Sequence, residues 1–111
     1  MPMLTIDKDT LAIKMVAKDT GDFVLTLDNY LLATGDEVVF TIGDGIGKEQ
    51  YLLQKKINEF NEGSAVIFLT SKDTDLPIGE YYYDIQVNTA DGRVDTVIGP
   101  AKFKIMGGVT Y

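Results

Sequence analysis

The sequence predicts an all-β sandwich of about seven antiparallel strands, and three observations lead to this prediction. Apolar and polar residues alternate with period two along most of the 111 residues, as they do in strands that bury one face. Turn-forming residues interrupt the alternation about every 8–12 residues. Strand segments do not alternate with helical segments, which argues against a parallel α/β sheet. A chain of this length is expected to form a single domain over residues 1–111.

The N-terminal half contains three alternating segments, residues 11–16, 23–28 and 37–42. The breaks between them, residues 18–22 and 34–36, consist mainly of Asp, Thr and Gly, which favour turns. We therefore expect three strands with short connections in this half of the chain.

Residues 48–60 allow two interpretations. Their Glu, Gln, Leu and Lys residues favour a helix. The segment also alternates, because Tyr51, Leu53 and Lys55 would share one face of a strand. No N-cap residue directly precedes the segment, so a helix would lack a start signal. We expect a strand with one exposed face.

The C-terminal half predicts three further strands and one short helical turn. Residues 64–70 are rich in β-branched and aromatic residues, as strands are. Residues 70–75 begin with hydroxyl side chains and have Asp at the fourth place. This pattern suits one short helical turn near 70–75 that is capped by Thr70 or Ser71.

The last two strands are predicted to form a hairpin. Asp91-Gly92 separates two alternating segments, and Asp-Gly is a strong hairpin signal. Gly99-Pro100 interrupts the return strand, which Phe103 and Ile105 continue. Because proline lacks a backbone N–H donor, this interruption indicates an edge strand, a bulge or a switch between sheets.

The composition excludes several kinds of chemistry. The chain has no Cys and no His. It therefore lacks thiolate metal sites, the usual general base, and the Ser-His and Cys-His nucleophile pairs. We expect a protein that is not an enzyme and that binds no cofactor.

The net charge and the hydropathy pattern limit the partners. The formal net charge is −7, which disfavours binding to nucleic acids and to anionic membranes. No apolar run approaches the ~20 residues that a membrane-spanning helix needs. The N-terminus has no basic region followed by an apolar core, so we expect no signal peptide and synthesis in the cytoplasm.

Two groups of residues superficially suggest ion binding. Residues 43–47 contain three glycines, but a phosphate-binding loop also needs a βαβ unit around it. Acidic clusters occur at residues 7–9, 19–22 and 73–75, but none has the ligand spacing of an EF-hand. A hairpin loop and solvated turns are the favoured interpretations, and no metal site is predicted.

Three consecutive tyrosines, Tyr81, Tyr82 and Tyr83, form the most distinctive motif. In a strand, Tyr81 and Tyr83 share a face with the following apolar residues and are expected to point into the core. Tyr82 would share the outer face with Asp84 and Gln86 and should be exposed. An exposed tyrosine suits an interface, but it is also a good β-former on a solvated face.

The residues before the tyrosines suggest a structural role for two of them. In Greek-key sandwiches a tyrosine near the start of the penultimate strand often donates a hydrogen bond to backbone just upstream. Leu76, Pro77 and Gly79 would form that upstream corner. We therefore expect Tyr81 and Tyr83 to stabilise the fold.

The chain also resembles a known family, the N-terminal domain of the baseplate upper protein of phages that infect Gram-positive bacteria. The resemblance covers residues of about 37–106. It rests on a Leu-Pro-x-Gly corner, a Tyr-x-Tyr-Asp-Ile-Gln strand, an Asp-Gly hairpin and a strand ending in Lys-Phe-x-Ile. The residues at the matching places are Thr74, Leu76, Pro77, Gly79, Tyr81, Tyr83, Asp84, Ile85, Asp91, Gly92, Phe103 and Ile105.

The resemblance implies an immunoglobulin-like antiparallel β-sandwich that connects parts of a phage or prophage tail or baseplate. Its location would be the virion, and its partners would be other tail and baseplate proteins, with self-association left open. The expected contact residues are Tyr82, Asp84 and Gln86, followed by Tyr51 and Tyr30. A carbohydrate-binding β-sandwich is the main alternative, and a small glycan hydrolase or its accessory domain is a weaker one.

Overall fold

The computed structural model describes residues 4–6, 11–27, 30–44 and 51–107, the first of these ranges by its backbone alone. These residues form eight strands and no helix, so the all-β prediction is confirmed. Strand β1 has three residues, and the other seven have four or more. The strands are β1 (Leu4–Ile6), β2 (Ile13–Val16), β3 (Gly21–Leu25), β4 (Glu37–Gly43), β5 (Leu53–Ile57), β6 (Ala65–Leu69), β7 (Gly79–Asn88) and β8 (Val94–Met106).

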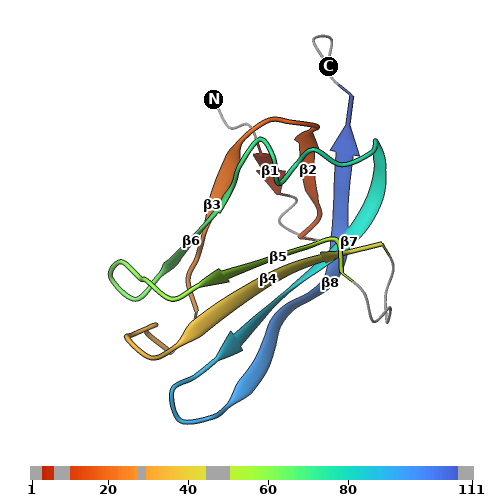
Figure 1. Cartoon of the computed structure of the whole chain (residues 1–111). Helices are drawn as coiled ribbons and strands as arrows, with labels where there is room; N and C mark the ends of the chain where they lie inside the picture. The colour runs from red at the N-terminus through yellow and green to blue at the C-terminus, as the bar shows by residue number, and fades with distance from the viewer. Residues whose placement is uncertain (1–3, 7–10, 28–29, 45–50, 108–111) are drawn as a thin grey trace.

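The strands form a large sheet and a small one. The large sheet has six strands in the order β1-β2-β8-β7-β4-β5, and β3 and β6 form a two-stranded sheet. Figure 1 shows that the large sheet curls, with β3 and β6 to one side of it. Strand β2 pairs with β8 in parallel, so the prediction of only antiparallel strands was wrong at this pair. Parallel neighbours need a long crossover connection, and here almost the whole chain separates the two strands.

The core is centred on one phenylalanine of β4. The ring of Phe40 is fully buried and lies 5.5 Å from the ring of Tyr83 and 6.3 Å from that of Phe103, measured between centroids. The ring of Phe23, on β3, lies 5.9 Å away with an edge-on geometry. Aromatic pairs at these separations are favourable beyond the area that they bury. The cluster therefore joins β4, β7 and β8 of the large sheet to the small sheet.

The ambiguous segment contains a strand in its described part. Residues 53–57 form β5, which pairs with β4 in antiparallel register. The prediction of a strand is thus confirmed for these residues. Residues 48–50, most of the glycine loop at 45–47 and the acidic cluster at 7–9 lie outside the described residues.

One hydrogen-bonded turn, but no helix, occurs at residues 70–75. The Thr70 N–H donates to Asp73 Oδ2 at 2.9 Å, and the Asp73 N–H donates to Thr70 Oγ1 at 3.1 Å. Thr70, rather than Ser71, is therefore the cap of this turn. Lys55 Nζ lies 2.7 Å from Asp73 Oδ2, which ties the turn to β5. The hydroxyl of the buried Thr74 donates to the carbonyl of Asp19 at 2.6 Å and ties it to the turn that precedes β3.

Strands β7 and β8 form the predicted hairpin, with an irregularity at the predicted place. The register shifts between Tyr83 and Ile85 and again between Ile85 and Gln86. On β8 this region contains Gly99 and Pro100, so the expected bulge is confirmed. The expected edge strand is confirmed as well, because among the described residues β2 pairs only with residues 103–106 of β8.

Candidate functional site

Tyr81 and Tyr83 have the structural roles that the sequence predicted. Their exposed fractions are 7% and 3%. The Tyr81 hydroxyl donates to the carbonyl oxygen of Pro77 at 2.6 Å, which forms the predicted corner. The Tyr83 hydroxyl donates to the carbonyl of Leu11 at 2.5 Å, and burial raises the pKa of Tyr83 to about 12. These two hydrogen bonds connect the segments before β7 and before β2 to the core.

Replacing Tyr81 with phenylalanine should lower the free energy of unfolding by about 1 kcal/mol, the net value of one hydrogen bond. The ring would stay in the core, so only the bond to Pro77 is lost. Tyr82→Phe is the matched control on the adjacent, outward-facing position, and it should change stability by less than about 0.5 kcal/mol. Urea unfolding of the two variants measures the difference, and equal stabilities would contradict the corner.

The outer face of β7 is less exposed than the sequence suggested. Tyr82, Asp84 and Gln86 do point away from the core, but all three are partly buried, so the expectation of an exposed Tyr82 was wrong. The reason is that β7 lies between β4 and β8, whose side chains flank it on both sides. Burial also raises the pKa of Asp84.

Tyr51 and Tyr30 are exposed, with exposed fractions of 56% and 41%. They do not lie together. The Leu52 N–H donates to the carbonyl of Ile42, which places Tyr51 near the end of β4, whereas Tyr30 bonds to Asp36, just before the start of β4. The five predicted contact residues therefore do not form one surface, and the two exposed tyrosines do not form a stacking platform for a sugar.

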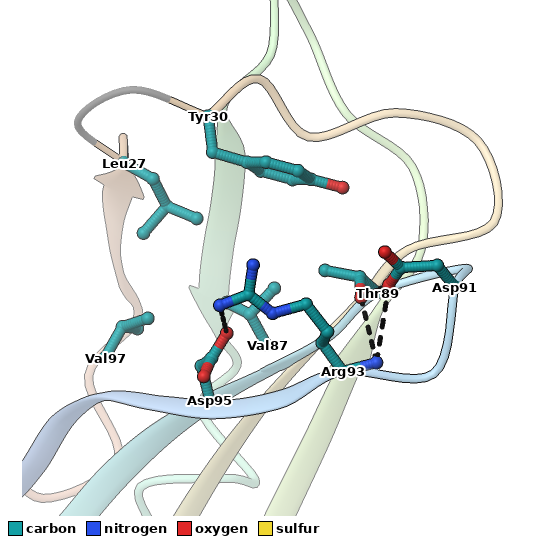
Figure 2. A pocket seen from close by; sticks show the side chains of 8 residues that line it. All are labelled: Leu27, Tyr30, Val87, Thr89, Asp91, Arg93, Asp95 and Val97. Atoms are coloured by element: carbon teal, nitrogen blue, oxygen red, sulfur yellow. Dashed lines mark hydrogen bonds and ion pairs between the residues drawn. The ribbon is translucent and has the colours of Figure 1, made fainter.

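Tyr30 lies over a pocket next to the β7–β8 hairpin (Figure 2). The cavity volume is about 280 Å³. Figure 2 shows the ring of Tyr30 on one side of this space and Val87 and Val97 on the other, with the side chain of Arg93 reaching between them. The pocket is lined by Leu27, Tyr30, Val87, Thr89, Asp91, Arg93, Asp95 and Val97.

Asp36 holds this pocket in place. Asp36 is only 3% exposed. Its Oδ2 accepts hydrogen bonds from the Tyr30 hydroxyl at 2.8 Å and from the Ala33 N–H at 3.0 Å. Its Oδ1 accepts one from the Ala90 N–H at 3.0 Å. The Ala33 N–H, then the Tyr30 hydroxyl and the Ala90 N–H, lower the pKa of Asp36. One carboxylate thus joins the loop before β4 to the turn of the hairpin.

Asp36→Asn should weaken the fold at neutral pH and reduce its sensitivity to acid. Because the pKa of Asp36 is lower in the folded than in the unfolded chain, its ionised form stabilises the fold above a pH of about 4, the unfolded value. This contribution is lost as the pH falls through the folded pKa. The difference in unfolding free energy between wild type and variant should therefore be largest at pH 7 and shrink towards pH 3. Equal differences at both pH values in urea unfolding would contradict this role.

The rim of the pocket is more acidic than basic. The Thr89 hydroxyl donates to Asp91, and the Arg93 N–H donates to Thr89 Oγ1 at 3.1 Å. The Thr89 hydroxyl and the Arg93 N–H lower the pKa of Asp91, which keeps it ionised. The Arg93 guanidinium lies 3.3 Å from Asp95 Oδ2, and both side chains are exposed. The charge of Arg93 also helps to lower the pKa of Asp91, which lines the pocket together with Asp95.

Sequence reasoning identified Tyr30 but missed its surroundings. The role of Asp36 was missed, because two of its three donors are backbone N–H groups, which no sequence motif reveals. One of these, the N–H of Ala90, is also distant in the chain. Asp95 and Val97 could have been found from the hairpin, since Asp95 pairs with the inward-facing Val87. Strand parity then places Val97 on the same face as Asp95.

In the described ranges, no cluster of three or more acidic side chains could hold a metal ion. None of the elements seen there is a helix that is long and apolar enough to cross a membrane. Comparisons with protein-family models, with curated proteins and with solved structures found no match.

Proposed function

We propose that this chain is a non-enzymatic connector module of a phage or prophage tail or baseplate, which works by docking against another protein. The observation that carries the proposal is the edge of β8 at residues 94–98, with which no other described strand pairs on the side away from β7. A sheet edge exposes backbone donors and acceptors that can pair with a strand of another chain. The partners would be other tail or baseplate proteins, and the location would be the virion.

An exposed apolar face gives further support. Val24 and Val66 are cross-strand neighbours on the two-stranded sheet. They and Phe68 are exposed, with fractions between 47% and 62%. A cluster of exposed apolar side chains often marks an interaction surface. The edge of β8 and this apolar face are both consistent with a module that binds other proteins and does not catalyse a reaction.

We also propose that the domain is a variant of the immunoglobulin-like sandwich. The bond from Tyr81 to Pro77 supports this proposal, because such corners occur at the penultimate strand of these domains. β7 is the penultimate strand here. The formal net charge of −7 argues for a protein partner and against nucleic acid or anionic membranes.

The direct test mixes the purified chain with each tail and baseplate protein encoded beside its gene. Light scattering would then measure the mass of any complex. We expect a complex with one of these proteins at micromolar concentrations. The absence of a complex with every one of them would contradict the connector function.

A carbohydrate-binding module is the second candidate. The observation that favours it is the pocket of about 280 Å³ in which one tyrosine ring lies near acidic and arginine side chains (Figure 2). Such a combination can stack on a sugar ring and bind its hydroxyls. Titration with N-acetylglucosamine, rhamnose and glucose would test it: amide NMR signals of the pocket residues should shift with one of them, and unchanged signals would exclude this function.

A further inference from the structure

The edge of β8 has a defined pattern of free backbone groups. The Thr89 N–H donates to the carbonyl of Arg93 at 2.9 Å, so these two residues form a hydrogen-bonded pair of the hairpin. Such pairs alternate along an antiparallel ladder. The next is therefore Val87 with Asp95, and the groups of Val94 and Thr96 point away from β7. Among the described residues no strand pairs with Val94 or Thr96 on that side.

The same strand forms a wall of the Tyr30 pocket. Asp95 and Val97 line this pocket, on the face of the sheet that also carries the buried Val87. If a segment of another chain paired with the edge, alternate side chains would lie on this face, next to those of Asp95 and Val97. The edge and the pocket can thus be occupied together by one extended peptide.

The size and charge of the pocket indicate which side chain fits. A cavity of about 280 Å³ is smaller than most sites for drug-sized ligands and suits a single long side chain. Leu27, Val87 and Val97 offer an apolar surface for an aliphatic stem, and the Tyr30 ring offers a face for a cation. The carboxylates of Asp91 and Asp95 outnumber the guanidinium of Arg93. The chain as a whole has a formal net charge of −7.

We propose that an extended segment of a partner protein adds to the sheet at Val94–Ile98 and inserts a lysine or arginine side chain into the pocket under Tyr30. This inference rests on the proposed connector function and names its docking site and the chemistry of its partner. The aliphatic stem lies along Val87 and Val97, and the charged end reaches Asp91 and Asp95. The incoming cation competes with Arg93 for Asp95, which now forms the ion pair.

The pocket needs little rearrangement to accept such a side chain. The Tyr30 hydroxyl is fixed by Asp36, and Asp36 also bonds the Ala90 N–H of the hairpin turn. Arg93 is the exception, but its side chain is 71% exposed and can swing into solvent at little cost. A preformed pocket binds more tightly, because fewer of its side chains must be ordered when the ligand binds.

A pair of synthetic peptides tests both parts of the proposal. The first is acetyl-Thr-Val-Lys-Val-Thr-Ser-amide, and the second has norleucine, which keeps the stem but not the charge, in place of the lysine. Both would be titrated into the ¹⁵N-labelled full chain and followed by NMR. We expect shifts at the amides of Val94, Thr96 and Val97, and an affinity for the lysine peptide about fivefold higher than for the norleucine peptide.

Two variants with matched controls separate the edge from the pocket. Thr96→Pro removes an outward N–H without breaking the β7–β8 ladder and should weaken binding of both peptides at least about fivefold. Thr96→Val keeps the N–H and should bind within about twofold of wild type. Asp91→Asn keeps a good hairpin turn and should remove most of the preference for lysine over norleucine.

Several results would overturn the proposal. One such result is peptide-induced amide shifts that do not include residues of β8. Equal peptide affinities of Thr96→Pro and Thr96→Val would also overturn it, as would equal affinities of the wild type for the lysine and norleucine peptides. Shifts at Val94 and Thr96 that depend on protein concentration without peptide would assign the edge to a second copy of the chain. Pocket shifts with a monosaccharide but not with the peptides would assign the pocket to a sugar.

The two proposals fail in different ways. If the wild-type chain forms a complex with a tail protein and Thr96→Pro forms it equally well, the edge site is wrong and the connector function stands. If no tail protein binds, the connector function is wrong, and the peptide titration still decides whether β8 is a site for strand addition.

Discussion

Phe40→Ala is expected to lower the free energy of unfolding by about 3–5 kcal/mol, the range for removing a buried phenylalanine. The ring is fully buried, and the rings of Phe23, Tyr83 and Phe103 surround it at centroid distances of 5.5–6.3 Å. Alanine would leave a cavity that these rings cannot fill, because they come from strands that the sheet ladders hold in register. For a domain with a typical stability of about 5–15 kcal/mol, this loss is a large fraction.

Phe68→Ala provides the matched control. Phe68 is 48% exposed and lies on the outer face of β6, so its removal creates no cavity. We expect a loss of less than about 1 kcal/mol. Guanidinium or urea unfolding followed by circular dichroism would compare the variants. If Phe40→Ala and Phe68→Ala had similar midpoints, the aromatic cluster would not be the centre of the core.

Local patterns predicted much of this fold because they are set by nearest neighbours in the chain. Strand parity separated Tyr81 and Tyr83 from Tyr82 correctly, since successive side chains of a strand point to opposite faces. The cap at Thr70 and the hairpin at Asp91-Gly92 follow from bonds within four residues. The corner at Pro77 is also local, four residues before Tyr81.

Features that depend on long-range contacts were not predictable in this way. The parallel pairing of β2 with β8 joins the two ends of the described chain, and no local pattern encodes it. The partial burial of Tyr82 depends on the position of β7 in the middle of the sheet. Parity gives the face of the sheet on which a side chain lies, but not how far the neighbouring strands cover it.

The candidate site shows the same limit. Asp36 and Ala90 are 54 residues apart in the chain, and their hydrogen bond forms only once β4 and β7 pair. Tyr30 was predicted as a contact residue; the structure leaves it 41% exposed, and its contact role stays a prediction. Its pocket lies beside the β7–β8 hairpin, and we expect the bulge at Gly99 to influence it, because bulges bend a strand and increase its twist.

Gly99→Ala is expected to cost about 2–4 kcal/mol, since close packing and an unfavourable backbone conformation act together. A Cβ atom at this position would lie 2.6 Å from the Cβ of Asp84 and 3.4 Å from its Cα. Asp84 lies on the central strand β7, so it cannot move away without disturbing the ladders on both sides. Gly99 also has a φ of +156°, which residues with side chains rarely adopt.

Gly79→Ala separates these two causes. Gly79 starts the same hairpin with a nearly equal φ of +159°, but a Cβ there would have no atom within 4 Å. Its cost should be about 1 kcal/mol, from the backbone alone. Because the bulge bends β8 directly after the edge at 94–98, Gly99→Ala should also shift the amide NMR signals of Asp95 and Val97, whereas Gly79→Ala should not. Equal unfolding free energies for the two variants would mean that Asp84 can move away from the added Cβ atom without cost. The bulge would then not fix the orientation of the pocket.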